Sequence, residues 1–375
     1  MKKAVMCGAD VHESSMTTRI AVNKDQPETR VFRYTVTGRH KMFKHLKLMA
    51  QKHGATRVVV AYEASSLGFG LCDECMDAGI ECYVLAPTKM PQSEEQRKRK
   101  TDKRDAQKIL EQLRGHVLAG NDLAKVWIPD PQTRDDREVV RMRLEVADKL
   151  TRARTQVRTL LKRNKLEKPE SVGNAWTVCE RHWLRRLTEP ESELAEGARV
   201  ALSSLLRQIA ALEEEIKNLD KAVKGLAETE RYGAAAGVLV EQLTGVAILS
   251  AMVFLTEMGD LRRFRNRKKV GAFMGVVPSS HESGEGAKDR KGHITRQGPA
   301  RLRKVLCQGA WSRVAFDPVE SKVHARIVEK NPKKKKIATV ACMRRLGIRM
   351  WHLALTAQLE AGVYENHELP ERIAA

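Results

Sequence analysis

The sequence predicts an α/β amino-terminal domain followed by mainly α-helical regions. Near the amino terminus, two stretches alternate apolar and polar residues, and a nearly continuous β-branched run follows at residues 57–61. Such a run is typical of a strand that is buried on both faces of a sheet. Farther along the chain, apolar residues recur every three or four positions, which indicates helices. Three strands followed by alternating helix and strand favour a mixed sheet with packed helices.

The expected elements divide the chain into three regions. We expect an α/β domain over residues 1–130, a helical coiled-coil region over 131–230 and a mainly helical domain over 231–375. In the first region the patterns predict strands at 3–8, 17–22, 31–37, 57–61 and 81–85, and helices at 40–53 and 67–78. In the last region they predict helices at 301–314 and 338–355.

The composition indicates a soluble protein with a polyanionic partner. The chain has 375 residues, a net charge of +21 and a pI near 9.8. A field of this sign attracts nucleic acid, although positive charge also keeps a protein soluble without any partner. The apolar runs are shorter than the roughly 20 residues that a membrane helix needs. The amino terminus lacks the pattern of a signal peptide, so we expect no membrane association and a cytoplasmic location.

The cysteines indicate a reducing compartment. There are seven, an odd number at irregular spacing, which argues against a disulfide framework. Cys72, Cys75 and Cys82 lie close together in the sequence. No second pair follows at the spacing of a zinc site, so we expect buried residues of a helix and the next strand, with zinc binding as the alternative.

Two long helices are expected in the middle of the chain. In the second, apolar residues step by three and four over four heptads, which is the pattern of a coiled-coil seam. These residues are Leu202, Leu205, Ile209, Leu212, Ile216, Leu219, Val223 and Leu226. The two helices can pack on each other as an antiparallel hairpin or pair with another subunit, and we favour a role in oligomerisation. Residues 232–236 (YGAAA) are expected to form a flexible joint after them.

Four carboxylates are candidates for a metal site. Asp10 and Glu63 end two predicted strands of one sheet, where paired acids are costly unless a cation joins them. Thr101 is the expected N-cap of a helix whose first turn carries Asp102 and Asp105 on one face. Carboxylates of this kind can hold two Mg²⁺ ions that act on phosphates. Taken singly, the two helical acids can instead serve the helix dipole, and Asp10 can cap a turn.

A serine lies in a glycine-bounded loop within a basic segment. Ser283 stands between Glu282 and Gly284, and residues 262–304 contain thirteen Lys/Arg against three acids. A hydroxyl in such surroundings suits attack on a phosphodiester, although most Ser-Gly loops are only turns. The basic residues expected to contact nucleic acid are Arg97, Lys98, Arg99, Lys100, Lys268, Lys269, Lys288, Arg290, Lys291, Arg296, Lys333, Lys334, Lys335 and Lys336. A solvated linker is the alternative for the last four.

Four motifs occur in an order that resembles a known family. They are residues 8–12 (GADVH), 60–64 (VAYEA), 100–106 (KTDKRDA) and 282–284 (ESG). In this order they resemble the DEDD transposases of the insertion-sequence-110 family, which are bridge-RNA-guided recombinases. The segment 292–298 (GHITRQG) is similar to a glycine-bounded segment after the family's serine. The turn at 244–247 (TGVA) departs from the family's Pro-Gly-Ile-Gly, so a phosphate cradle and simple packing are equally good interpretations.

The resemblance implies a fold, a site and partners. It implies a RuvC-like, ribonuclease-H-type first domain with Asp10, Glu63, Asp102 and Asp105 as ligands of Mg²⁺. It implies Ser283 as the nucleophile that forms a 5′-phosphoserine link to DNA. It further implies donor and target DNA, a guide RNA, and a homodimer or a tetramer on DNA. The alternatives are a metal-only nuclease of the junction-resolvase type, in which water attacks, and a non-enzymatic nucleic-acid-binding protein.

Overall fold

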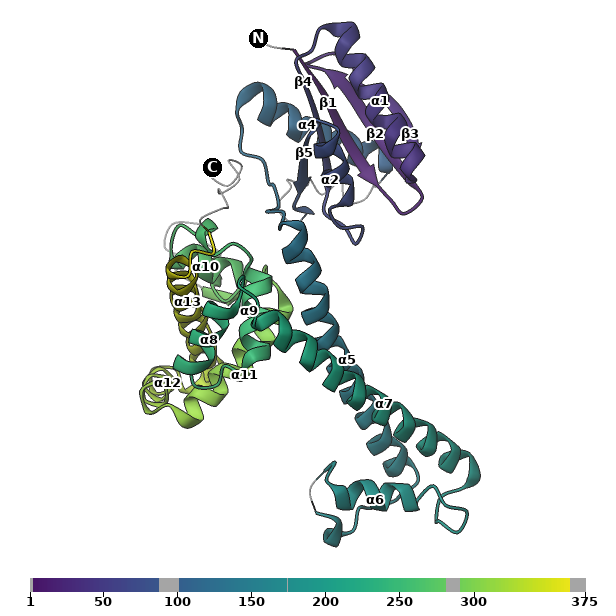
Figure 1. Cartoon of the computed structure of the whole chain (residues 1–375), viewed down its shortest axis with the longest axis vertical. Coiled ribbons are helices and arrows are strands. Elements are labelled where there is room, and N and C mark those ends of the chain that lie inside the picture. The colour runs from purple at the N-terminus through teal and green to yellow at the C-terminus, as the bar shows by residue number, and fades with distance from the viewer. Residues whose placement is uncertain (1–2, 88–100, 174, 281–290, 365–375) are drawn as a thin grey trace. The chain divides into compact units, whose positions relative to one another are not determined.

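The computed structural model describes residues 3–87, 101–173, 175–280 and 291–364. The chain divides into two compact units, Met1–Ile128 and Pro129–Ala375 (Figure 1). The boundary expected between residues 230 and 231 falls inside the second unit, so the division into three regions stays a prediction. Among the described helices, none is both long and apolar enough to cross a lipid bilayer.

The first unit is built on a five-stranded mixed sheet in the order β3-β2-β1-β4-β5. The two pairs made by β2, with β1 and β3, are antiparallel, whereas the two pairs made by β4, with β1 and β5, are parallel. This arrangement confirms the predicted mixed sheet and is consistent with the ribonuclease-H-type fold. The strands are β1 (Ala4–Val11), β2 (Ser15–Val22), β3 (Glu28–Arg33), β4 (Arg57–Glu63) and β5 (Glu81–Leu85).

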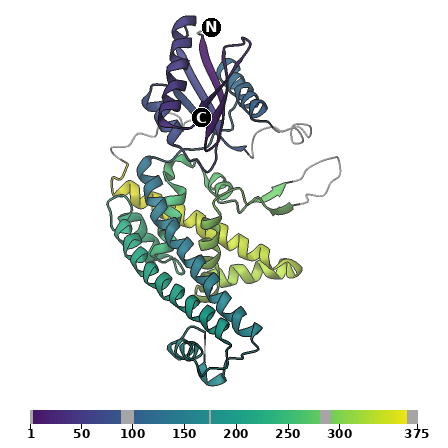
Figure 2. The same ribbon diagram turned by 90° about the vertical axis from the view of Figure 1, so that its right-hand side faces the viewer.

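Helices cover both faces of this sheet (Figures 1 and 2). Alternate side chains of a strand point to opposite faces, so Val5 and Cys7 of β1 pack in one cluster and Met6 packs in the other. The first cluster includes buried residues of α1 (Val36–His53) and α2 (Gly70–Asp77). The second includes Ile109, Leu110 and Leu113 of α4 (Asp102–Ala119). The helix α4 therefore lies alone on its face among the described helices of this unit.

The third strand lies three residues earlier than predicted. We expected it at 31–37, but β3 ends at Arg33 and α1 begins at Val36. The reason is a helix cap that the alternating pattern concealed. The Thr35 side chain accepts a hydrogen bond from the backbone N–H of Gly38 at 3.1 Å, which starts the helix at this point.

The clustered cysteines are structural. Cys72 and Cys75 lie in α2 and Cys82 lies in β5, and all three are buried and take part in no disulfide among the described residues. Their side chains belong to the apolar cluster under α1 and α2. This placement confirms the prediction of a helix and the strand after it. Their burial in this apolar cluster fits the packing interpretation, and the metal-ligand group found among the described residues lies elsewhere.

The second unit begins with two long antiparallel helices, α5 (Pro131–Arg163) and α7 (Glu196–Ala227). Their side chains cross-link them in antiparallel register: Arg143 Nε donates to Asp220 Oδ1 at 2.7 Å, and Arg154 Nη2 donates to Glu213 Oε1 at 2.7 Å. The short α6 (Val178–Arg186) packs at the end of the pair (Figure 1). The hairpin interpretation is thus observed within one chain, and the coiled-coil pairing of subunits stays a prediction.

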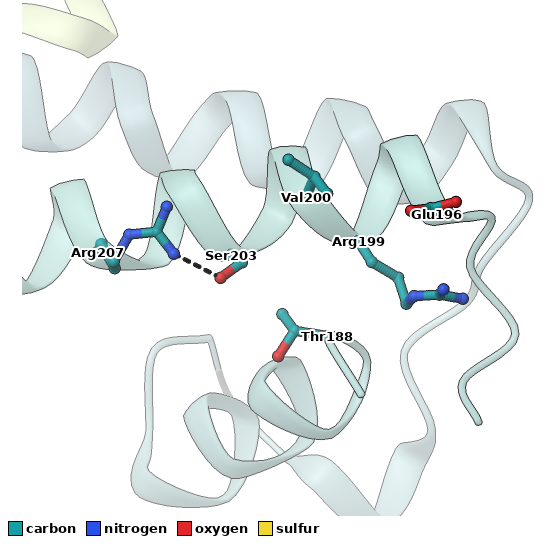
Figure 3. Close-up of a pocket in the computed structure, with 6 residues that line it drawn as sticks. All are labelled: Thr188, Glu196, Arg199, Val200, Ser203 and Arg207. Atoms are coloured by element: carbon teal, nitrogen blue, oxygen red, sulfur yellow. Dashed lines mark hydrogen bonds between the residues drawn. The ribbon is translucent and has the colours of Figure 1, made fainter. Parts of the chain in front are cut away.

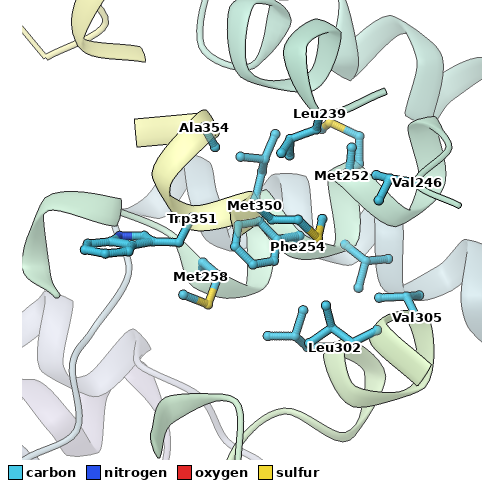
Figure 4. Packing of buried hydrophobic residues seen from close by; sticks show 14 of the residues in the cluster. Leu239, Val246, Met252, Phe254, Met258, Leu302, Val305, Met350, Trp351 and Ala354 are labelled. Atoms are coloured by element: carbon cyan, nitrogen blue, oxygen red, sulfur yellow. The ribbon is translucent and has the colours of Figure 1, made fainter. Parts of the chain in front are cut away.

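A helical core fills the rest of the second unit. Its largest apolar cluster joins residues of α5 and α7 to the carboxy-terminal helices, with Phe254, Met252 and Met350 fully buried (Figure 4). The predicted helices at 301–314 and 338–355 are observed with longer bounds. The carboxy-terminal helices are α8 (Gly233–Gln242), α9 (Ile248–Met258), α10 (Arg267–Phe273), α11 (Ala300–Phe316), α12 (Pro318–Lys330) and α13 (Lys336–Glu360).

The expected flexible joint at residues 232–236 is wrong. Tyr232 is buried as the N-cap residue of α8, and Ala235 and Ala236 are buried in the same core. The Tyr232 hydroxyl donates to Asp136 Oδ2 at 2.7 Å, which ties α8 to α5. The run of small residues therefore serves close helix packing and not flexibility.

Candidate metal centre and the framework of the serine segment

Three polar side chains meet where the carboxy-terminal end of β1 and the start of α4 come together. Asp10 lies near the end of β1, His12 follows two residues later, and Asp102 is the first residue of α4. His12 Nε2 lies 3.3 Å from Asp10 Oδ2 and 3.7 Å from Asp102 Oδ1. One ligand atom from each residue lies within 4.8 Å of the other two. Residues that are about 90 positions apart in the chain are thus gathered into one cluster.

Gly8 allows α4 to lie close enough to β1. A β-carbon at this position would meet the Ala106 carbonyl oxygen at 2.4 Å and the Leu110 backbone nitrogen at 2.4 Å. Real β-carbons do not approach backbone atoms so closely, because the atoms would overlap. The glycine of the first motif therefore positions the first turn of α4, and Asp102 with it, beside Asp10.

The electrostatics of the cluster favour a cation. Partial burial raises the pKa of the Asp10 carboxyl, and the negative charges of Asp102 and Asp105 raise it further. His12 works against this shift through its charge and its hydrogen bond. A raised carboxyl pKa means that the ionised form lacks compensating positive charge. A divalent cation would supply that charge, so the donor set of two carboxylates and an imidazole fits a metal ion.

The two other predicted ligands lie next to this cluster in the fold. Ala9 pairs with Tyr62 across the parallel strands β1 and β4, so Asp10 and Glu63 are the next residues of two neighbouring strands. Asp105 lies one turn after Asp102 in α4 and is half-buried. Neither belongs to the group of three ligand atoms. Thr101 is the N-cap residue of α4 as predicted, although its side chain makes no capping hydrogen bond.

His12 is the member of the cluster that was not predicted from the sequence. It is part of the first motif, but only Asp10 of that motif was predicted as a ligand. The signal was its spacing, since residues two apart on an extended chain point to the same side. On this spacing, His12 shares the side of the chain on which Asp10 lies.

The structure describes some of the basic residues that were predicted to contact nucleic acid. Lys268 and Lys269 are exposed in the first turn of α10, and Arg296 is exposed with a left-handed backbone (φ 54°). The four lysines at 333–336 are all exposed, which fits both a backbone contact and a solvated linker. Lys291 lies in β7 (Lys291–Ile294). Outside the described residues lie Ser283, Arg97, Lys98, Arg99, Lys100, Lys288 and Arg290.

Two short strands flank the serine segment. β6 (Pro278–Ser280) and β7 form an antiparallel pair on either side of residues 281–290. The Ser279 hydroxyl donates to the His293 carbonyl oxygen at 3.0 Å, which gives this serine a structural role across the pair. The end of the pair is fixed by Thr295, whose N–H donates to the Val277 carbonyl oxygen at 2.9 Å.

The turn at 244–247 serves packing. Gly245 has a left-handed backbone (φ 80°), and a β-carbon there would meet the Gly309 carbonyl oxygen and the Ser312 β-carbon, each at 2.8 Å. The turn is therefore pressed against α11. This close contact accounts for the glycine without a phosphate, so of the two interpretations the structure favours packing.

A shallow pocket of about 330 Å³ opens between the end of α6 and the start of α7 (Figure 3). None of the predicted site residues lines it. Its charges are mixed, and one guanidinium is held inside it, since Arg207 Nη1 donates to Ser203 Oγ at 2.8 Å. The lining residues are Thr188, Glu196, Arg199, Val200, Ser203 and Arg207.

Comparison with known proteins identifies the family. Residues 238–325 match the model of the transposase IS116/IS110/IS902 family, and residues 7–164 match a DEDD transposase model of the IS110 type. The chain belongs to the IS110 family of transposases. The first match contains the β6–β7 pair, and the second contains Asp10, His12, Glu63, Asp102 and Asp105.

Individual relatives agree with this assignment. A putative transposase, y4qE, of Sinorhizobium fredii is 30% identical over 257 residues, which are 68% of this chain and 58% of that protein. The transposase for insertion sequence element IS1533 of Leptospira borgpetersenii is 27% identical over 313 residues, 83% of this chain and 86% of that protein. The transposase for element IS1111A of Coxiella burnetii is 24% identical over 243 residues, 63% of this chain and 60% of that protein.

Proposed function

We propose that this IS110-family chain is an insertion-sequence transposase that cuts and exchanges DNA strands in the cytoplasm. The observation that carries the proposal is the meeting of Asp10, His12 and Asp102 at the junction of β1 and α4. Carboxylates gathered in this way are costly without a cation and are typical of enzymes that act on phosphates. A protein that only binds nucleic acid has no need of such a cluster.

The ligands of the proposed metal site are Asp10, Glu63, Asp102 and Asp105, which would hold two Mg²⁺ ions. When bound, the ions would polarise the scissile phosphate and stabilise negative charge on the departing oxygen. His12 is within hydrogen-bonding distance of Asp10 and lies 3.7 Å from Asp102, so its imidazole would help to orient the Asp10 carboxylate. The choice of Mg²⁺ rests on the oxygen-rich donor set.

Ser283 is the proposed nucleophile. Its Oγ would form a bond to phosphorus while the bond from phosphorus to the 3′-oxygen breaks, leaving a 3′-hydroxyl and a 5′-phosphoserine. The serine proton would leave with a general base, and the departing 3′-oxygen would take up a proton. A 3′-hydroxyl of a partner strand would then attack the same phosphorus and release the serine, so no phosphodiester is lost.

The proposed partners follow from the family. Donor and target DNA would be paired with a guide RNA, and the protein would bind the phosphate backbone through its basic residues. The net charge of +21 supports this mode of binding. Two or four copies of the chain would act together, with α5 and α7 as the elements that pair.

The test is the capture of a covalent protein–DNA link. Purified protein would be incubated with its guide RNA, labelled matching DNA and Mg²⁺ and then denatured on a gel. We expect a protein-linked DNA band that is lost in Ser283→Ala and in Asp102→Ala. Ser279→Ala is the matched control and should keep the band. The Ser279 hydroxyl donates to the His293 carbonyl oxygen and is not the proposed nucleophile. Metal-dependent cleavage without a linked band would identify a hydrolytic nuclease instead.

A further inference from the structure

The segments that flank residues 281–290 carry an excess of positive charge. Residues 262–280 and 291–304 contain eleven Lys/Arg and no Asp or Glu. Some of these cations have acidic partners on α5. Arg301 Nη2 donates to Glu145 Oε1 at 2.6 Å, and Lys304 pairs with Asp148. These pairs account for two of the cations at the start of α11.

Arg303 is held among carbonyl groups beside another arginine. Its Nη1 donates to the Gly298 carbonyl oxygen and, at 3.4 Å, to that of Met274. Burial lowers the pKa of the Arg303 guanidinium, and the positive charge of Arg296 lowers it further. Within the described ranges neither arginine forms an ion pair with a carboxylate. Two like charges held together in this way are stabilised when an anion joins them.

Arg344 of α13 reaches the same region from the other side. A β-carbon built on Gly271 of α10 would lie 3.1 Å from Arg344 Nε and 3.4 Å from Val277 Cγ1. Arg344 Nε and the side chain of Val277, the residue that directly precedes β6, thus both border Gly271. Its Nε is buried and has no hydrogen-bond acceptor in the described part of the chain. A buried donor of this kind is costly, about 1–3 kcal/mol, until an acceptor arrives.

A second polar atom lacks a partner at the same junction. Thr295 pairs through its backbone with Val277, and its Oγ1 is buried without a hydrogen-bond partner among the residues described. Arg344 and Val277 thus border the same glycine, and Thr295 is hydrogen-bonded to Val277. Unsatisfied buried polar groups call for a missing partner, and one ligand that binds in this region could serve both.

We propose that Arg344 and Thr295, together with Arg303 near Arg296, bind a backbone phosphate of the DNA at the end of the β6–β7 pair. A guanidinium and a hydroxyl are donors that phosphodiester oxygens accept. These would be positioning residues that hold DNA next to the serine segment. The inference rests on the proposed function only in taking DNA as the source of the phosphate.

The test measures DNA affinity without cleavage. Binding of a labelled DNA duplex would be followed over a series of salt concentrations in EDTA, with Arg344→Met, Thr295→Val and wild type. For Arg344→Met we expect binding on the order of tenfold weaker and a salt slope lower by about 0.9, the effect of one lost phosphate contact. Thr295→Val should weaken binding with a smaller change of slope, since it removes a neutral donor.

Two comparisons separate this role from a structural one. Arg349→Met removes the same charge from an exposed position of α13 and should leave the salt slope unchanged. Both test variants should keep or raise the melting temperature of the free protein, because each removes an unsatisfied buried polar group. Unchanged DNA affinity, equal effects of Arg344→Met and Arg349→Met, or a defect with an RNA hairpin but not with DNA would each overturn the proposal. Loss of the covalent band with normal DNA binding would concern the serine chemistry alone.

Discussion

Asp10 shows how one residue can trade stability for function. Its folded-state pKa is raised, so between its unfolded and folded pKa values the native state binds more protons than the unfolded state. The free energy of unfolding therefore falls as pH rises through this window, and the penalty is complete above the folded pKa. Above this window the ionised Asp10 destabilises the metal-free protein. A bound cation would reverse this effect.

The first prediction is that Asp10→Asn stabilises the metal-free protein and abolishes its response to metal. In EDTA above this pH window, the variant should melt at a higher temperature than wild type, and the difference should shrink as pH falls through the window. Mg²⁺ at about 100 times its Kd should stabilise wild type by ~2.7 kcal/mol and the variant by far less. Thermal unfolding with and without Mg²⁺ measures both effects. A variant that still responds fully to Mg²⁺ would remove Asp10 from the site.

At the scale of elements, the cluster depends on how closely α4 lies on the sheet. The second prediction is that Gly8→Ala forces α4 away from β1, because the new β-carbon would overlap the backbone of Ala106 and Leu110. We expect a loss of about 1–3 kcal/mol in unfolding free energy, together with weaker Mg²⁺ binding. Gly70→Ala, at the open start of α2, is the control and should be neutral or slightly stabilising. Equal behaviour of the two variants would show that the helix position does not depend on Gly8.

The sequence predicted those elements whose signals are local. The β-branched run gave β4, and β5 was predicted with its observed bounds, because buried strands carry dense apolar signals. The cap at Thr35 was missed because a threonine also suits a strand. His12 was missed because its role depends on Asp102, about 90 residues away, and on the tight contact at Gly8. The grouping of Arg344, Thr295 and Arg303 could not be predicted for the same reason, since they come from α13, the segment after β7 and α11.

At the scale of the whole molecule, the two long helices of the second unit contribute to two separate apolar clusters. Val140 and Leu144 of α5 belong to the core of the carboxy-terminal helices, whereas Leu150 and Val157 of the same helix belong to the cluster under α6. Of the heptad residues in α7, three are buried and the others are half-buried within the chain: Leu205, Leu212, Ile216, Leu219 and Leu226. A half-buried apolar stripe of this length supports the proposal that the helices also pair between subunits.

The third prediction concerns which subunits supply the reactive groups. Asp102 and Ser283 belong to different compact units of one chain, so chemistry that needs both can draw them from one subunit or from two. If subunits pair through α5 and α7 and share their groups, mixing Ser283→Ala with Asp102→Ala should restore the covalent DNA link that each variant lacks alone. The link should form only on the Asp102→Ala chain, because that chain keeps the serine, and a size tag on one variant would show this. A double variant carrying both changes, mixed with Asp102→Ala, is the control and should give no link. If the two single variants fold and bind DNA but give no link when mixed, the carboxylates and the serine of one chain must act together, and the helices would serve assembly without exchange of catalytic groups.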